Sequence, residues 1–325
     1  MAKNKRNKNS NKRIIITDRK HGLPYSKGLL ASSIMATGLA PSRAYQVAKS
    51  VEETLRSKNK YAVSIMELRE LTENILLHDV GEAYQEKYIK WQSLSKLDRP
   101  LIILIGGTTG VGKSTIATEL AHRLGITRII STDAIREVMR AIFSEELMPA
   151  LYRSSFDAWR QLRVPLPEKS DPVKVGFREQ ASSVVTGVNA LIQRSITEGA
   201  NQIIEGVHIV PGFIDFSAYE SEAQVIPIVI TVEDENLHRS HFYIRELETE
   251  GYRPFEKYKA NFDNIRKIGL YIEKLAIDNK IDIISSINLD ATISEVLDTI
   301  LDRAIESRDN ISVQKNVSHG KKKQI

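Results

Sequence analysis

A glycine-rich segment constrains the fold of this chain more than any other part of its sequence. Residues 107–114 read Gly-Thr-Thr-Gly-Val-Gly-Lys-Ser, which has the glycine, lysine and serine spacing of a phosphate-binding loop. The apolar run 101–105 precedes the loop, and apolar residues follow it at helical spacing, at positions 116, 117, 120 and 124. A chance glycine-rich turn rarely has both neighbours, so the segment predicts a strand–loop–helix unit that grips an anion.

The composition of this loop has a direct physical meaning. Glycines let the backbone curl until several N–H groups point at one anion, and the start of the following helix adds partial positive charge. We expect Lys113 to act catalytically on the β- and γ-phosphates of ATP, and Ser114 to offer a hydroxyl to Mg²⁺ or another divalent cation. The predicted nucleotide site comprises Gly107, Thr108, Thr109, Gly110, Val111, Gly112, Lys113, Ser114 and Thr115.

The sequence after the loop alternates between strand and helix patterns. The predicted strands are continuous apolar runs, which is typical of a parallel sheet covered on both faces. They lie at 101–105, 128–131, 202–205, 225–232 and 281–285. We predict a doubly wound parallel α/β fold of the P-loop NTPase type, with strand order 2-3-1-4-5 by analogy with nucleoside monophosphate kinases. The long gap 133–200 predicts a lid or small subdomain that ends in one helix from Pro172 to Glu198, capped by Asp171.

The first part of the chain has a different pattern. Residues 13–95 predict a small, mainly helical domain that begins with a strand at 13–17 and a turn at 21–25. The segment 95–100 ends in Asp-Arg-Pro and reads as the linker to the second domain, predicted at 96–307. The remaining segments, 1–12 and 308–325, are polar and basic and predict disordered tails.

The charge distribution separates these tails from the folded part. The net charge is +5, yet residues 1–13 carry six Lys/Arg and residues 315–325 carry four Lys, without any acid. Removing these ten charges leaves the rest at about −5, which is not the basic face of a nucleic-acid-binding protein. The chain has no cysteine and no apolar run long enough to span a bilayer, which fits a cytoplasmic protein without a membrane partner.

A second group of candidate residues lies at the end of the second predicted strand. Ligands of open α/β sheets bind outside the carboxyl ends of the strands, which places Asp133 near the phosphates. Its carboxylate can accept the proton of an attacking hydroxyl, and Arg136, one helical turn later, suits an anionic group of the acceptor. Both are predicted to bind substrate, and Asp133 to act catalytically. An Asp133 that caps the next helix is the alternative, and it is compatible with the first.

The third and fourth predicted strands end in further candidates. Glu205 occupies the position where P-loop enzymes hold Mg²⁺ or its waters, and it is predicted as a metal ligand. His208 is predicted to contact substrate, although a lone histidine is more often structural. Arg239 and Arg245 are predicted catalytic arginines of a lid over ATP, against the alternative of a solvated charged helix.

The long insertion after the second strand is rich in arginine. An acceptor that carries both a phosphate and a carboxylate needs such cationic groups, and Arg178 is predicted to bind it. Most charged residues in such a stretch are solvent-exposed, which is the alternative for each of these arginines. They lie at positions 140, 153, 160, 163 and 178.

From the loop onward, over roughly residues 100–303, the chain resembles archaeal 2-phosphoglycerate kinase. The matching segments include 106–114, 131–137, 203–212 and 238–242, of which the last two are the more specific. The resemblance implies phosphorylation of 2-phosphoglycerate by ATP to 2,3-bisphosphoglycerate, the first step toward cyclic 2,3-diphosphoglycerate. Asp133 and Arg136 also resemble the Asp and Arg pair of polynucleotide kinases and zeta toxins, in which the Asp faces the acceptor hydroxyl.

The N-terminal domain has a resemblance of its own. Residues 13–91 are similar to an ATP-cone, a nucleotide-sensing regulatory module, through the segments 13–17, 23–27 and 64–68. This resemblance implies a nucleotide effector at the N-terminal domain. Two other functions stay open: a polynucleotide or nucleoside kinase, which the acidic core disfavours, and a non-catalytic ATP-binding regulator. An oligomer is possible with any of them.

Overall fold

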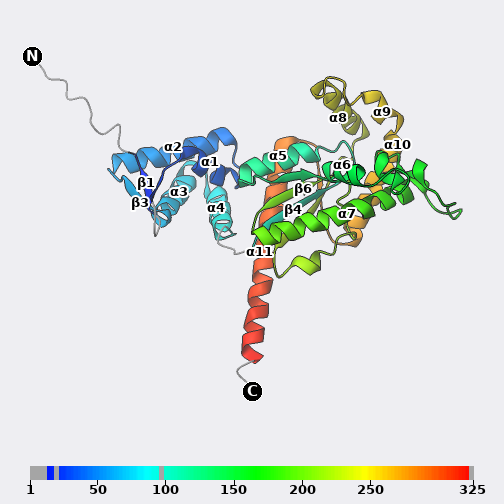
Figure 1. Ribbon diagram of the computed structural model, residues 1–325. Coiled ribbons are helices and arrows are strands. Elements are labelled where there is room, and N and C mark those ends of the chain that lie inside the picture. The colour runs from blue at the N-terminus through cyan, green and yellow to red at the C-terminus, as the bar shows by residue number, and fades with distance from the viewer. Residues whose placement is uncertain (1–12, 18–21, 95–98, 322–325) are drawn as a thin grey trace, which may run out of the picture. The chain divides into compact units, whose positions relative to one another are not determined.

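The computed structural model of the chain describes residues 13–17, 22–94 and 99–321, with side chains up to residue 307 (Figure 1). The predicted tail 1–12 therefore lies outside the described residues, as do the last four residues of the other predicted tail. The chain divides into two compact units. Of the described residues, one unit holds those up to 94 together with 123–125, and the other holds the rest.

The first unit contains a small sheet and four helices. Its three strands have the order β2-β1-β3, with β1 antiparallel to β2 and parallel to β3. The strands are β1 (Ile15–Thr17), β2 (Gly22–Pro24) and β3 (Ala62–Ser64), and the helices are α1 (Lys27–Met35), α2 (Pro41–Ser57), α3 (Ile65–Asp79) and α4 (Glu82–Leu94).

Local sequence explains most of this unit. The aliphatic residues of α2 recur three or four positions apart, and all of them are buried: Ala44, Val47, Ala48, Val51 and Leu55. The first turn of α3 is held by a capping box, in which Ser64 accepts from the backbone of Glu67 and the Glu67 side chain accepts in return. The predicted turn at 21–25 is wrong for residues 22–24, which form β2. Pro24 is tolerated there because β2 is an edge strand.

The second unit is built on five parallel strands in the order β5-β6-β4-β7-β8. Numbered from the phosphate-binding loop, this is 2-3-1-4-5, so the predicted order and the α/β fold class are confirmed. The strands are β4 (Leu101–Gly106), β5 (Ile129–Ser131), β6 (Gln202–Glu205), β7 (Gln224–Thr231) and β8 (Asp282–Ser285).

The apolar runs end up inside the sheet because helices cover it. The side chains of residues 102–105 in β4 are all fully buried, and Ile102 and Leu104 share one core cluster with α7. The covering helices are α5 (Lys113–Leu124), α6 (Thr132–Ile142), α7 (Pro172–Glu198), α10 (Phe262–Asp278) and α11 (Leu289–Lys321). Figure 1 shows α7 and α11 running along this layer of strands.

The insertion between β5 and β6 has the predicted organisation. After α6 it forms two short 3₁₀ turns, Pro149–Tyr152 and Ala158–Gln161, and ends in the long helix α7. The side chain of Asp171 accepts from the backbone N–H of Val173 at 3.0 Å, as expected of an N-cap, and Gly199 ends the helix in the left-handed conformation.

The C-terminal part of this unit departs from the prediction at one point. Helix α11 continues to Lys321, so the expectation of a disordered tail from residue 308 is wrong for 308–321. The reason is visible in the sequence, because no proline or glycine interrupts residues 289–319. Two further helices, α8 (Glu235–Glu248) and α9 (Phe255–Ala260), and a 3₁₀ turn, Phe216–Tyr219, complete the unit. None of the described helices combines the length and apolar character needed to cross a lipid bilayer.

Candidate active site

The glycine-rich loop connects β4 to α5 and can be built only with glycine at its tightest points. Gly107 has a φ of +130°, and a Cβ there would lie 2.3 Å from the carbonyl oxygen of Ile230 on the neighbouring strand. Gly110 has a φ of +90°, and a Cβ there would collide with the ring of Phe242 on α8. The predicted strand, loop and helix are therefore all present, and the loop is tightly enclosed by β7 and α8.

Lys113 begins α5, and its side chain is only 8% exposed. Its Nζ donates to the carbonyl oxygen of Thr108 at 2.7 Å. Burial lowers the pKa of this ammonium, and the nearby carboxylates of Glu205 and Asp133 oppose that shift. An ammonium held in a dry loop by one carbonyl is costly by itself, so the geometry suits a bound anion such as a nucleotide phosphate.

Ser114, in the first turn of α5, meets Glu205 at the end of β6. The hydroxyl of Ser114 donates to Oε1 of Glu205 at 3.0 Å, and Glu205 is buried at the end of β6, next to β4. The part of the chain with described side chains has no group of three or more His, Cys, Asp or Glu that could hold a metal alone. One hydroxyl and one carboxylate are nevertheless the protein ligands that Mg²⁺ takes when nucleotide phosphates and water supply the rest.

Two histidines of α8 contact carbonyl oxygens of the loop, a role that was not predicted for them from the sequence. Nε2 of His238 is 2.8 Å from the carbonyl oxygen of Thr109, and Nδ1 of His241 is 2.9 Å from that of Gly110. A carbonyl only accepts, so each ring nitrogen donates. Burial lowers the pKa of His238 to about 4. With the carbonyls tied outward, the amides of the loop are left free to face an anion.

Asp133 lies in the first turn of α6, but it is not the cap of that helix. The side chain of Ser131 accepts from the backbone N–H of Ala134 at 3.1 Å and is the N-cap. The carboxylate of Asp133 is therefore available, is 60% exposed, and lies 3.5 Å from Nε of Arg136. Of the two readings of Asp133, the structure excludes capping and leaves a carboxylate that faces solvent.

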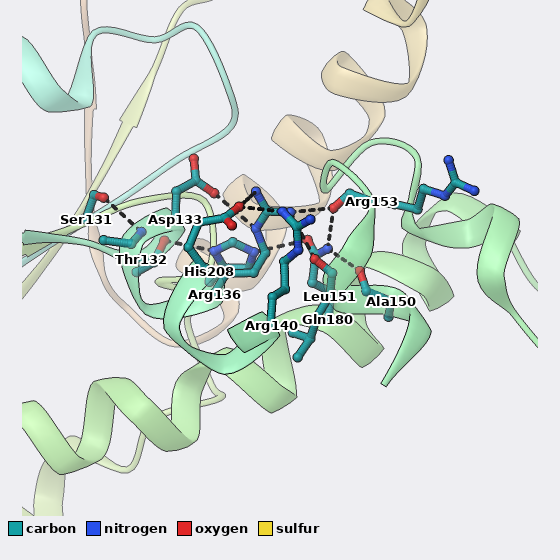
Figure 2. Close-up of polar contacts among 12 residues, drawn as sticks. Ser131, Thr132, Asp133, Arg136, Arg140, Ala150, Leu151, Arg153, Gln180 and His208 are labelled. Atoms are coloured by element: carbon teal, nitrogen blue, oxygen red, sulfur yellow. Dashed lines mark hydrogen bonds and ion pairs between the residues drawn. The ribbon is translucent and has the colours of Figure 1, made fainter. Parts of the chain in front are cut away.

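Arg136 has a different environment from the one predicted. Its guanidinium is mostly buried, and Nη1 donates to the backbone carbonyls of Leu151 at 3.1 Å and of Arg153 at 2.7 Å. These bonds hold the insertion against α6, as Figure 2 shows. Arg136 lines the candidate pocket, but much of its hydrogen-bonding capacity is used within the protein.

His208 is part of a buried chain of polar side chains (Figure 2). The amide nitrogen of Gln180 donates to the carbonyls of Ala150 and Arg153, so its Oε1 must accept from Nε2 of His208, 3.1 Å away. Nδ1 of the neutral ring then accepts from the hydroxyl of Thr132 at 2.8 Å. Burial lowers the pKa of His208 to about 4. Both ring nitrogens are thus used within the protein, which favours the structural role of His208 over contact with substrate.

The three remaining predicted arginines do not converge. Arg239 forms a 3.7 Å ion pair with Glu235, and its guanidinium lies 3.6 Å from the ring centroid of Phe262. Arg245 lies farther along α8 and lines the cavity that is described in the next paragraph. Arg178 is exposed on α7 and does not line that cavity, so the structure does not bring it to the site as predicted.

A cavity of about 260 Å³ adjoins both the loop and Asp133. Its walls come from α6, from the segment after the first 3₁₀ turn, and from α8 and α9 with the segment between them. Phe156, Val207, Tyr252, Pro254 and Tyr258 supply the apolar and aromatic part of its lining. The other lining residues are Thr109, Asp133, Arg136, Ser154, Ser155, Arg245, Arg253 and Lys257.

Comparisons with known proteins place this geometry in a family. Residues 103–239 match the family model described as "AAA domain". The chain is 38% identical to a 2-phosphoglycerate kinase of Methanopyrus kandleri, over 93% of this chain and 91% of that protein. It is 42% identical to one of Methanothermobacter thermautotrophicus, over 88% and 92%, and 40% identical to one of Pyrococcus horikoshii, over 90% and 95%.

A solved structure is also similar, at a much lower level. A gluconokinase from Sinorhizobium meliloti is matched over 66% of this chain and 97% of that chain, with 13% identity and a TM-score of 0.37. The curated relatives therefore carry the family assignment.

Proposed function

This chain belongs to the 2-phosphoglycerate kinase family, and from that membership we propose that it transfers the γ-phosphoryl group of ATP to 2-phosphoglycerate. One observation about its own residues supports the proposal most strongly. The carboxylate of Asp133 and the phosphate-binding loop, at Thr109, line the same small cation-rich cavity. An acceptor in that cavity has its hydroxyl beside a proton acceptor and beside the loop that holds the phosphoryl donor.

Separate residues act on the attacking hydroxyl and on the transferred phosphoryl group. The 3-hydroxyl oxygen of 2-phosphoglycerate forms a bond to the γ-phosphorus, and the bond from that phosphorus to the β–γ bridging oxygen breaks. The products are ADP and 2,3-bisphosphoglycerate. Asp133 orients the hydroxyl and takes its proton, and Lys113 stabilises the negative charge on the phosphoryl oxygens. The role of Arg239 as a second cation at these oxygens stays a prediction.

The loop and its neighbours fit a nucleotide with a divalent cation. The backbone amides of residues 107–115 would hold the phosphates of ATP, because His238 and His241 keep two of the loop's carbonyls turned away. Ser114 and Glu205 would hold Mg²⁺. When bound, the cation neutralises charge on the β- and γ-phosphates and so lowers the barrier to transfer.

A panel of acceptors tests the proposal. The purified chain is incubated with labelled ATP and Mg²⁺, and 2-phosphoglycerate is compared with glycerate, sugars, nucleosides and oligonucleotides by detection of the labelled product. We expect transfer to 2-phosphoglycerate with kcat/KM well above that for every other acceptor. Transfer only to nucleosides or oligonucleotides would establish the rival kinase function. Binding of ATP without transfer to any acceptor would establish the regulator.

The role of the N-terminal unit is a separate question. The resemblance of residues 13–91 to an ATP-cone predicts that this unit binds a nucleotide effector, and that residues 13–95 form a regulatory domain. Calorimetric titration of the Lys113→Ala variant with ATP tests this, because the variant lacks the main cation of the kinase site. Residual tight binding that a substitution within residues 13–91 abolishes would support the prediction, and loss of all tight binding in Lys113→Ala would contradict it.

A further inference from the structure

The cation-rich cavity contains three side chains that the proposed chemistry does not yet use. Arg245 comes from α8, Arg253 from the segment before α9, and Lys257 from α9 itself. In the part of the chain with described side chains, no carboxylate forms an ion pair with Arg245, Arg253 or Lys257. The only carboxylate in the lining is that of Asp133, which already lies against Arg136.

Several cations nearby differ from these three in having a carboxylate as an ion-pair partner. Lys259, on the same short helix as Lys257, lies 3.2 Å from the carboxylate of Glu256. Lys267 on α10 lies 3.2 Å from Asp171, and Arg160 in the insertion lies 3.1 Å from Asp157. Three unpaired positive charges around one small cavity repel each other, and an anion placed among them removes that repulsion.

We propose that Arg245, Arg253 and Lys257 form the acceptor-binding site and that they recognise a small ligand carrying both a phosphate and a carboxylate. The proposal rests on the proposed function, since it assigns the residues that select the acceptor of that same reaction. The hydroxyls of Ser154 and Ser155, both half-buried in the lining of the same cavity, supply further donors to the ligand.

Charge and size both agree with such a ligand. A phosphate ester carries about two negative charges near neutral pH and a carboxylate carries one, so together they match the three unpaired cations. Guanidinium groups suit both anions because they can donate two parallel hydrogen bonds to either. The cavity of about 260 Å³ is smaller than the roughly 300–1,000 Å³ of sites for drug-sized molecules. It therefore favours a compact acid over a nucleoside.

Aromatic rings and the insertion hold the walls of this site in place. The guanidinium of Arg245 lies 5.9 Å from the ring centroid of Tyr258, and the ammonium of Lys257 lies 6.0 Å from that of Phe156. The carbonyl of Arg153, just before the two serines, accepts from both Arg136 and Gln180. A ligand held by its anionic groups here extends its hydroxyl toward Asp133 and the loop.

A matched pair of lysines tests the assignment. Lys257 and Lys259 lie on the same exposed helix, but only Lys257 lines the cavity. We expect Lys257→Met to raise KM for 2-phosphoglycerate about tenfold or more, with KM for ATP changed less than about twofold. Lys259→Met should leave both constants within about twofold. Arg253→Met and Arg245→Met should each raise the acceptor KM at least as much as Lys257→Met.

A charge series at Lys257 separates recognition from packing. The acceptor KM should rise in the order Lys257→Arg, Lys257→Met, Lys257→Glu, because the effect follows charge, while the same series at Lys259 should stay flat. Thermal midpoints and ATP binding show that each variant is folded. If the unmodified chain does not phosphorylate 2-phosphoglycerate, the proposed function fails. If it does, but the acceptor KM of all three Met variants stays within about twofold, the acceptor site is wrong.

Discussion

The nucleotide half and the acceptor half of the candidate active site are built in opposite ways. The nucleotide half is one continuous segment, residues 107–115, whose predicted ligands are mostly backbone amides and whose lysine is nearly buried. The acceptor half is made of long side chains from separate parts of the chain, and Arg253 and Lys257 are exposed. One half is set before any ligand arrives, and the other must lose side-chain freedom when a ligand binds.

This difference shows which kind of site a single sequence reveals. A backbone cradle requires glycines at fixed spacing, because residues such as Gly107 and Gly110 leave no space for a side chain. A side-chain pocket requires only that the fold bring suitable residues together, and its members need no common spacing in the chain. A backbone cradle can therefore be recognised from local sequence, whereas a side-chain pocket can be recognised only from the tertiary structure.

The largest expected effect comes from breaking the nucleotide half. Lys113→Ala removes the buried ammonium of the loop, and we expect kcat to fall on the order of a thousandfold or more. The thermal midpoint should not fall, because burial disfavours this charge and already lowers the pKa of Lys113. Steady-state kinetics and a thermal melt measure the two effects. Turnover at the normal rate would refute the assignment of the loop.

The next effect lies where the two halves meet. Asp133→Asn keeps the shape of the side chain but removes the proton acceptor, and kcat should fall about a hundredfold. The Kd of ATP should change by less than about twofold, since Asp133 lines the acceptor cavity. Single-turnover kinetics with calorimetry separates the two quantities. An unchanged kcat would leave Asp133 with only its ion pair to Arg136.

The buried ring of His208 predicts an effect of pH on the stability of the fold. Burial lowers the pKa of His208 from 6.5 to about 4, so between these values the unfolded chain takes up a proton that the folded chain does not. Lowering the pH from 7.5 to 5 should therefore cost about 2 kcal/mol of unfolding free energy through this ring. Urea denaturation across that range measures the slope.

Two histidine variants, one at His208 and one at a control position, test this prediction. His208→Gln should reduce the pH dependence while lowering stability at pH 7.5, because one or both hydrogen bonds to Thr132 and Gln180 weaken. His122→Gln, which changes an exposed histidine of α5, should leave the slope as it is. A slope that is the same in the unmodified chain and in His208→Gln would show that His208 is not the group that titrates.

The smallest effect is expected outside both halves. Arg178→Ala changes an exposed side chain of α7, away from the acceptor cavity, so KM for 2-phosphoglycerate should stay within about twofold. A tenfold rise in this constant would restore the sequence-based prediction and would extend the acceptor half to α7. The same kinetic assay as for Lys257→Met provides a direct comparison.

Much of the fold could be predicted because its strands appear in the sequence as continuous apolar runs. The loop, the five parallel strands and the cap at Asp171 follow from local patterns, and the strand order followed from analogy and is confirmed. The three-residue strands of the first unit were harder, because such short segments carry little pattern. Pairing with β1 makes residues 22–24 a strand rather than the predicted turn.

The differences between the expected and the observed surroundings of the site residues have a common physical cause. His208, Arg136 and Arg178 were predicted from residue type and approximate position, but burial and hydrogen-bond partners decide what each can touch. The three unpaired cations of the acceptor half come from two helices and a turn, which no spacing rule connects. One signal was available: His238 and His241 are three residues apart and so share a helix face, next to the loop in the fold.

Helix α8 touches both substrates' sites, which has a consequence for how they bind. Near its start it is tied to the glycine-rich loop by two histidines, and farther along it carries Arg245 into the acceptor cavity. A helix transmits displacement along its length, so an acid that pulls on Arg245 also steadies the loop. We therefore expect synergy: each substrate tightens the other, and thermodynamic reciprocity makes the two enhancement factors equal.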